Sequence, residues 1–532
     1  MNTLTTLFPS RTRLLLVIIG CHSCWLSLVY GQTTPTVRPT TGYAELGGYA
    51  VTGPMPFWLR ANQSGIVPLK GSTGLARLGF VLDYSQPTNV DSLTKSRRFD
   101  WGLGLELVGS TGLQSQVLLP EAYGKLRWGP IELYVGRRRS IAGLVDTLLT
   151  SGSYAWSGNA MPLPKIQIGT IGYVPIGFTK GFVAINTFYN HGWFTDGFVR
   201  NSYLHQKAFY MRLGKPHARF HAYLGGNHEV QWGGYAPSLV GVPGLSDNLD
   251  GQFASNLDAY YRVVTGTSGT GYIPPQGVIS IDQGNRIGNH LGTLDLGFDV
   301  RLGSWQLMGY RQSLYETGAL YYLTNIVDGL HGLSLQRKSP SDRRWSVDRF
   351  LVEFFYSKSQ GGPEFIIDDP QRRGRNNYFN HSQYQDGWTY QGRTIGTPFL
   401  TPQAEVNPDL PVSRAIVNNR VALWHMGLAG QLNQQIHWQT KLSYSQNFGT
   451  YDTPYPAGTN QFSALVTLNG PVYLPGLGRC QLNTSLALDT GKLLQNSVGG
   501  YLGLRKTLGS GQASRNVSSS GAGSQPMLRV PQ

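Results

Sequence analysis

The chain of 532 residues carries 68 glycines, 12% aromatic residues and 14% charged residues, and its formal net charge is +15. Two of its three cysteines lie among the first 31 residues, so the remainder, with Cys480 alone, can form neither an internal disulfide nor a cysteine-based metal site. The basic balance indicates an anionic partner, and the export signal described next argues against nucleic acid.

Residues 1–31 are predicted to be a secretory signal peptide. Arg11 and Arg13 precede the apolar run Leu14–Val29, which is the order of regions found in such signals. The run is shorter than the about 20 apolar residues that a membrane-spanning helix needs. Cys21 leaves lipidation open as an alternative to simple cleavage.

After a periplasmic linker at 32–42, the pattern predicts an all-β fold, a transmembrane antiparallel β-barrel over residues 43–508. Residues 293–302 alternate between two sets. The even positions from Leu294 to Leu302 are apolar, and the odd positions from Asp295 to Arg301 are polar or glycine. Such alternation is typical of a wall with one face on lipid and the other on the lumen. Eighteen strands are predicted, at 43–52, 74–85, 100–109, 120–128, 131–137, 165–174, 182–189, 204–213, 218–226, 293–302, 304–313, 330–337, 347–358, 420–430, 435–448, 460–469, 480–488 and 498–508.

The predicted connections sort by length once both chain ends are placed on one side of the wall. The shortest turns fall on the side of the termini, at Gly129-Pro130, Lys215-Pro216-His217, Gly303 and Asn433-Gln434. The long connections fall on the opposite side, at 53–73, 138–164, 227–292 and 359–419. Short periplasmic turns and long outer loops are typical of membrane barrels. We therefore expect an outer-membrane location with periplasmic termini, extracellular loops that plug the mouth, and a flexible Ser/Gly-rich tail at 509–532.

The predicted outer loops combine aromatic rings with amide, guanidinium and carboxylate groups. Rings pack on the apolar faces of sugars, planar polar groups bind their hydroxyls, and arginine can hold uronates or phosphates through two bonds. The candidate polysaccharide-binding residues are Trp58, Arg60, Asn62, Arg137, Arg139, His228, Glu229, Trp232, Arg372, Arg373, Arg375, Tyr378, His381, Tyr384, Trp388, Tyr390 and Arg393. The alternative interpretation is that these side chains hold long loops across the barrel mouth. Since loops 227–292 and 359–419 each lack a positive excess, we expect stacking and hydrogen bonds rather than an electrostatic trap.

No motif predicts an enzyme, a metal site or a cofactor. His228-Glu229 begins like the H-E-x-x-H motif of zinc proteases, but Trp232 stands where the second histidine belongs. Asp282 is followed by too few ligands for a calcium loop, and G-x-S-x-G is absent from the sequence. A Ser/His pair on the barrel wall stays open, because such pairs arise easily by chance.

The sequence resembles the capsule assembly Wzi family over roughly residues 45–505. The resemblance rests on Pro56-Phe-Trp-Leu-Arg-Ala-Asn-Gln63, Glu121-Ala-Tyr-Gly-Lys-Leu126 with Gly136-Arg137, Ser151-Gly152 to Asn159-Ala160 with Pro162-Leu-Pro164, Asn227-His-Glu-Val-Gln-Trp-Gly-Gly234, Asp328-Gly-Leu-His-Gly332, and Asn376-Asn-Tyr-Phe-Asn-His-Ser-Gln-Tyr384 through Gly396-Thr-Pro398. It implies an eighteen-stranded outer-membrane barrel whose lumen is plugged by loops and helical pieces. It also implies a lectin-like, non-enzymatic role, in which exported capsular or exopolysaccharide is held at the cell surface.

Two other functions compete with polysaccharide retention. A wall of eighteen strands is wide enough for a diffusion porin, which single-channel conductance would test. A barrel enzyme acting on lipid or glycan is the weaker alternative, and it predicts loss of activity when one Ser or His is replaced. The expected partners are capsular or extracellular polysaccharide, outer-membrane lipid and lipopolysaccharide.

Overall fold

The structure is a computed structural model. It describes residues 36–87, 99–195, 197–240, 251–268, 286–316, 318–366 and 374–508. The predicted signal peptide and tail lie outside the described residues, as do Arg372 and Arg373. No described helix is long and apolar enough to cross a membrane.

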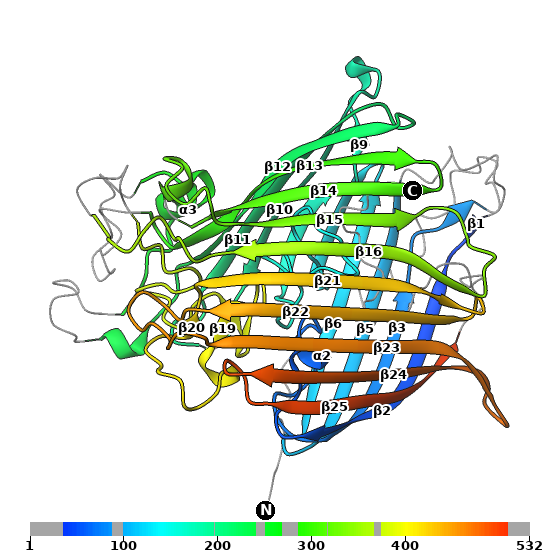
Figure 1. Ribbon diagram of the computed structural model, residues 1–532. Coiled ribbons are helices and arrows are strands. Elements are labelled where there is room, and N and C mark those ends of the chain that lie inside the picture. Colours follow the sequence, from blue (N-terminus) through cyan, green and yellow to red (C-terminus); the bar gives the residue numbers. More distant parts are fainter. Residues whose placement is uncertain are drawn as a thin grey trace, which may run out of the picture.

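Within the described residues, eighteen long antiparallel strands close into a barrel (Figure 1). They are β2 (Thr40–Thr52), β3 (Thr73–Leu82), β5 (Phe99–Gly112), β6 (Gln116–Trp128), β7 (Ile131–Arg137), β8 (Lys165–Thr170), β10 (Val183–Trp193), β11 (Tyr203–Leu213), β12 (Phe220–Trp232), β13 (Asn289–Leu302), β14 (Trp305–Tyr315), β15 (Gly329–Arg337), β16 (Trp345–Tyr356), β21 (Val421–Leu432), β22 (Ile436–Asn447), β23 (Asn460–Leu474), β24 (Gly478–Gly491) and β25 (Ser497–Leu508). The last strand pairs with the first, with Leu504 opposite Leu46. Each strand overlaps one predicted segment, so the predicted fold and strand count are confirmed.

The remaining elements are short. Two-residue strands are β1 (Thr36–Val37), β4 (Gln86–Pro87), β9 (Val174–Pro175), β17 (Thr389–Tyr390), β18 (Arg393–Thr394) and β19 (Thr401–Pro402), and β20 (Ile416–Asn418) has three residues. The helices are α2 (Phe57–Arg60), α3 (Leu257–Thr265) and the 3-10 turns η2 (Gly177–Thr179), η3 (Pro237–Leu239), η5 (Gly318–Leu320) and η6 (Gln403–Glu405).

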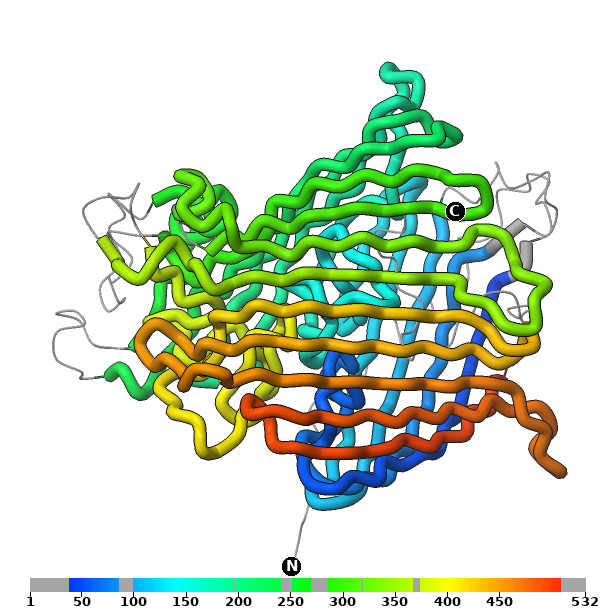
Figure 2. The backbone as a smooth tube through the Cα atoms, in the orientation of Figure 1, coloured from blue at the N-terminus to red at the C-terminus, as the bar shows by residue number. Residues whose placement is uncertain are grey.

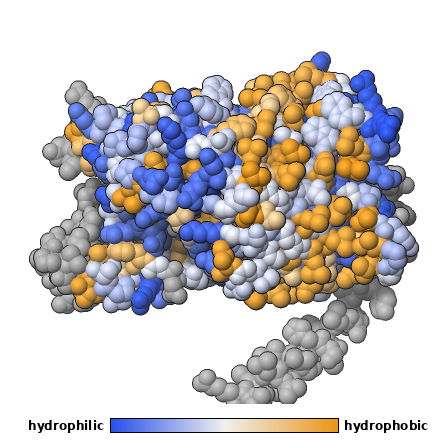
Figure 3. Space-filling model, turned by 60° about the horizontal axis from the view of Figure 1, so that its bottom comes forward, coloured by the Kyte–Doolittle hydropathy of each residue, from blue (hydrophilic) through white to orange (hydrophobic). Residues whose placement is uncertain are grey.

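The strands expose one apolar face, as their alternation predicts. On β13, Leu294 is 59% exposed on the outer face, whereas its neighbour Asp295 is completely buried in the lumen. Figure 3 shows apolar residues gathered over the strand wall and hydrophilic residues at the end that carries the loops. Apolar side chains left this exposed in water would be unfavourable, so the wall is built to face lipid.

The two ends of the barrel differ in the length of their connections. Gly42 at the start of β2 pairs with Leu508 at the end of β25, so both ends of the wall lie at what we call the turn end. Connections there include 129–130, 303–304 and 433–435. The opposite, loop end carries the connections 53–72, 138–164, 233–288 and 357–420, in agreement with the predicted segregation (Figures 1 and 2).

The outer ends of β12 and β13 differ from the prediction. Residues 227–232 were expected to begin a loop, but β12 continues through Trp232, and Gln231 pairs with Asn289 of β13. The outward side chains of this extension pack against α3 rather than facing lipid. The alternation itself continues, with Glu229 and Gln231 on the lumen face and Val230 and Trp232 on the outer face, but these outer residues contact a helix and not lipid.

Candidate functional site

The segment 138–164, which we call the strap, crosses the barrel lumen. It leaves the wall between β7 and β8, and the backbone N–H of Leu144 donates to Asp295 of β13 at 2.8 Å. The N–H of Ser151 donates to Glu353 of β16 at 2.7 Å, and the Leu149 carbonyl lies 2.7 Å from Nε2 of His425 on β21. Since β21 lies about halfway round the ring from β7 and β8, the strap joins opposite walls.

The segment 53–72 also enters the lumen. The N–H of Phe57 donates to Asp489 of β24 at 2.7 Å, and the Trp58 indole N–H donates to Ser443 of β22 at 3.1 Å. These strands lie near β2 and β3, from which the segment leaves. The helix α2 thereby fills the part of the lumen beside the closing pair of strands.

Glu405 holds two arginines at the centre of this plug. Its carboxylate pairs with Arg60, and Arg393 Nη1 donates to it at 3.0 Å. Burial raises the pKa of Glu405, but the two guanidinium groups outweigh it, so the pKa lies below its ordinary value. Burial also lowers the pKa of Arg393. An ion triplet this deep is costly to break, because removing one member leaves an unpaired buried charge.

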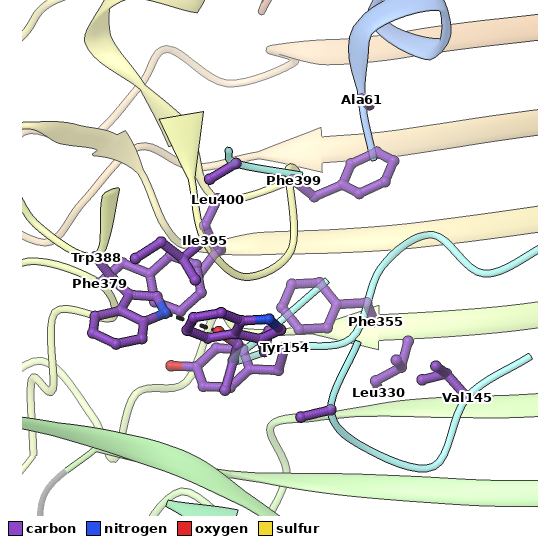
Figure 4. Packing of buried hydrophobic residues seen from close by; sticks show 14 of the residues in the cluster. Ala61, Val145, Tyr154, Leu330, Phe355, Phe379, Trp388, Ile395, Phe399 and Leu400 are labelled. Carbon is purple, nitrogen blue, oxygen red and sulfur yellow. Dashed lines mark hydrogen bonds between the residues drawn. The ribbon is translucent and has the colours of Figure 1, made fainter. Parts of the chain in front are cut away.

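A third region, within 357–420, brings an aromatic core onto the strap (Figure 4). The Trp388 indole N–H donates to the Ala155 carbonyl at 2.8 Å, and the rings of Tyr154 and Phe379 lie 5.0 Å apart. Because both residues of the strap are completely buried, this contact joins the loop end to the strap as one apolar core.

Two buried carboxyls sit beside this core. The Tyr154 hydroxyl donates to Glu316 at 2.5 Å, and the Tyr378 hydroxyl donates to Asp328 at 2.7 Å. Burial raises the pKa of Glu316 to about 8 and that of Asp328 to about 6. At neutral pH Glu316 is therefore largely protonated, which suits an apolar site.

Most of the predicted binding residues with described coordinates are buried in this plug or in the wall. The buried members are Trp58, Arg60, Arg139, Glu229, Trp232, Tyr378, Tyr384, Trp388, Tyr390 and Arg393. Asn62, Arg137, His228, Arg375 and His381 are partly exposed. Their contacts with the plug match the alternative interpretation of these residues, in which they hold the loops in place.

Three predicted residues on β12 do not share one site. Glu229 points into the lumen, where Gln206 Nε2 donates to it at 3.0 Å. His228 and Trp232 alternate with it and lie on the outer face, and His228 Nε2 is 2.9 Å from Nδ1 of His290. The strand therefore splits the predicted cluster between the two sides of the wall.

An accessible cluster lies at the loop end, and we call it the basic rim. It consists of Lys358, Arg375, Arg414, Arg420, Phe448, Tyr451 and Asp452. The Arg420 guanidinium lies 3.7 Å from the centre of the Tyr451 ring, and the Lys358 ammonium 4.0 Å from that of Phe448. Asp452 pairs with Arg375 and lies 3.9 Å from Arg414.

The sequence prediction identified Arg375 but missed the other members of the basic rim. They come from the connections 357–420 and 448–459, and the charge balance of each loop taken alone gives no sign that their cations meet. The rim can bind an anion between planar cations and stack a sugar ring on tyrosine. Among the described residues, no group of three or more His, Cys, Asp or Glu could hold a metal ion.

Comparison with known proteins supports the fold. No family profile and no curated protein matches the sequence. The solved structure of Wzi, described as a carbohydrate-binding β-barrel involved in group 1 capsule assembly in Escherichia coli, is similar with a TM-score of 0.52 and 14% identity. The match covers 87% of this chain and 84% of that chain.

The solved structure of OccK2 (OpdF) from Pseudomonas aeruginosa matches less well. It has a TM-score of 0.43 and 8% identity over 88% of this chain and 97% of that chain. The similarity to Wzi shows that the chain has the fold of an outer-membrane β-barrel, and the predicted likeness to Wzi holds at the level of fold.

Proposed function

We propose that this protein is an outer-membrane barrel that binds and retains capsular or exopolysaccharide at the cell surface, without catalysing a reaction. The termini lie in the periplasm and the loop end faces outward. The observation that carries the proposal is the strap bonded to both sides of the lumen, because a filled lumen leaves the loop end as the working surface. Wzi, whose fold is similar, is described as carbohydrate binding, which agrees with this role.

The basic rim favours an acidic glycan. The rim contains four basic residues and one carboxylate, Asp452, which pairs with Arg375 and lies 3.9 Å from Arg414. The rim therefore keeps a positive excess for uronate or phosphate groups. The Arg420–Tyr451 pair offers a flat face on which a sugar ring can stack. Arg137 and His381, which are partly exposed, remain proposed glycan contacts outside the rim.

The first test is deletion of the gene in its host. We expect polysaccharide to move from washed cells to the medium while its total amount stays constant. An unchanged division between cells and medium would overturn the proposal. Complementation with the wild-type gene controls for effects on neighbouring genes.

The second test isolates the rim. We expect Arg414→Gln combined with Arg420→Gln to weaken binding of an acidic oligosaccharide roughly tenfold, the loss of about one charge-assisted bond. Arg343→Gln is the matched control, because this exposed arginine lies in the connection 338–344 at the turn end. Equal binding by the wild-type protein, the double variant and the control variant would exclude the rim as the glycan site.

A diffusion porin is the competing function, and conductance separates the two. The purified barrel in a planar bilayer should give no steady ion current, because the strap and 53–72 fill the lumen. A stable open channel in the wild-type protein would favour the porin instead.

A further inference from the structure

A second aromatic site lies on the outer face of the wall. The helix α3 packs Ala259 and Val263 against Val230 and Trp232 of β12, at the loop end of the barrel (Figure 1). Its first turn stands away from the strands and leaves an open pocket of about 690 Å³ between helix and wall. That volume lies within the usual range for small-ligand sites, about 300–1,000 Å³. The pocket is lined by His191, Trp232, Ser255, Asn256, Leu257, Asp258 and Tyr260.

The lining has the chemistry of a sugar site. The rings of Trp232 and Tyr260 lie 5.3 Å apart, and His191 lies within 6.2 Å of both ring centres. Trp232 is 4% exposed, and its indole N–H has no hydrogen-bond partner in the structure. A buried donor left without a partner is unfavourable by about 1–3 kcal/mol. Because this nitrogen is enclosed, the pocket offers a ligand the rings of Trp232 and Tyr260 rather than the indole N–H.

The position of the pocket indicates where its ligand comes from. On the same outer face, nearer the turn end, β11 and β12 expose the lipid-facing residues Phe209 and Leu224. The pocket lies beyond this apolar belt, toward the loops, and opens sideways from the wall. If the loop end faces outward as proposed above, this is the level of the saccharide layer of the outer leaflet.

The polar groups around the pocket favour a sugar over an acyl chain as the ligand. Asn256, whose side chain accepts from the Ala259 N–H, and Asp258, which pairs with Arg262, line one side. An acyl chain would cover these polar groups with apolar surface, whereas sugar hydroxyls can hydrogen-bond to them. Lys207, whose ammonium group donates to the Val264 carbonyl, and Arg286, which donates to the Gly266 carbonyl at 2.8 Å, flank the far end of α3. These cations suit the negative charge of an outer-leaflet glycolipid.

We propose that the pocket between α3 and β10–β12 binds a sugar ring in the saccharide headgroup of an outer-leaflet glycolipid of the lipopolysaccharide class. This inference rests on the proposed orientation of the barrel, but it concerns a site separate from the basic rim. The site fastens the protein laterally to its own membrane, whereas the basic rim binds the exported polymer.

The test uses the full-length barrel in phospholipid nanodiscs. Native mass spectrometry would count copies of added lipopolysaccharide, truncated to its innermost sugars, that stay bound. We expect Tyr260→Ala and His191→Ala each to lower retention roughly tenfold, since each removes a stacking face. Tyr260→Phe keeps its ring and should retain the glycolipid. Tyr261→Ala is the matched control, because this neighbour on α3 is 64% exposed and does not line the pocket.

Competition experiments with the same protein identify the ligand. Phosphatidylglycerol should not compete, and the free core oligosaccharide should compete at high concentration. Equal retention by His191→Ala and Tyr261→Ala, or competition by phosphatidylglycerol alone, would overturn the glycolipid site. Because His191 belongs to the wall, its variant reports on the pocket even if Tyr260→Ala displaces α3. Binding of acidic oligosaccharide by the same variants should stay unchanged, which separates failure of this site from failure of the basic rim.

Discussion

The plug core and the pocket beneath α3 contain the same kinds of aromatic residue, but these residues have different roles in the two places. In the plug, Trp388 is completely buried and its N–H is bonded to Ala155. In the pocket, Trp232 is almost as buried, yet its N–H has no partner and its ring borders open space. Burial of an aromatic residue therefore does not reveal its role: Trp388 completes a core, whereas Trp232 borders a pocket.

The strongest test of this comparison is Trp388→Ala. Removing a fully buried indole leaves a cavity, so we expect the free energy of local unfolding of the strap to fall by about 3–5 kcal/mol. Hydrogen exchange at the backbone N–H groups of 142–157 would measure it. Trp388→Phe, which keeps most of the apolar contact, should lose far less.

Breaking the anchor of the strap should have the next largest effect. Glu353 accepts bonds from the Ser151 N–H and the Thr150 hydroxyl, and Glu353→Ala leaves these donors unpaired, at about 3 kcal/mol in total. We expect transient opening of the lumen, seen as intermittent current in planar bilayers. Asp342→Ala, at an exposed carboxylate of the turn end, should stay closed; steady closure of both variants would show that other contacts hold the strap.

The pH dependence of the plug follows from Glu316. Its pKa in the folded protein, about 8, lies above the ordinary value of 4.5. The stabilisation is therefore complete below about pH 4.5 and is lost as the pH rises through 8. We expect exchange at the Phe379 N–H, which donates to Glu316 at 2.8 Å, to speed up at least roughly tenfold from pH 5 to 9 beyond its intrinsic increase. Glu316→Gln should remove this excess.

The smallest effect is expected at the basic rim. The Arg414 side chain is 48% exposed, and its ion pair with Asp452 is long, at 3.9 Å. Arg414→Gln should change the free energy of unfolding by less than about 0.5 kcal/mol, which urea titration would measure. A larger loss of stability would mean that the rim supports the plug, like the arginines around Glu405.

The wall could be predicted from sequence because lipid imposes a local rule. Each strand must show apolar residues at every second position, and Leu294 and Asp295 obey that rule without reference to any distant residue. The predicted end of β12 was too early, although Val230 and Trp232 alternate with Glu229 and Gln231, because residues 227–232 were interpreted as part of a loop. The outer face of β12 contacts α3 there. The sequence of α3, Leu257–Thr265, does not by itself identify Ala259 and Val263 as the residues that pack on the wall.

The candidate site was less predictable than the wall. The loops were correctly expected to plug the mouth, but nothing local distinguishes Trp388, which completes the core, from an aromatic residue that binds sugar. The basic rim depends on which loops meet, since Arg420 reaches Tyr451 from a different connection. Such contacts between distant segments leave no periodic trace in the sequence.

The strap also constrains the order in which the barrel can assemble. Its bonds to Glu353 and His425 join residues 202 and 276 positions apart, and both partners come from strands made long after the strap. The strap therefore cannot settle until β16 and β21 have entered the wall. The segment 53–72 waits still longer, because Phe57 bonds to Asp489 of β24, so the lumen is filled only as the last strands enter the wall.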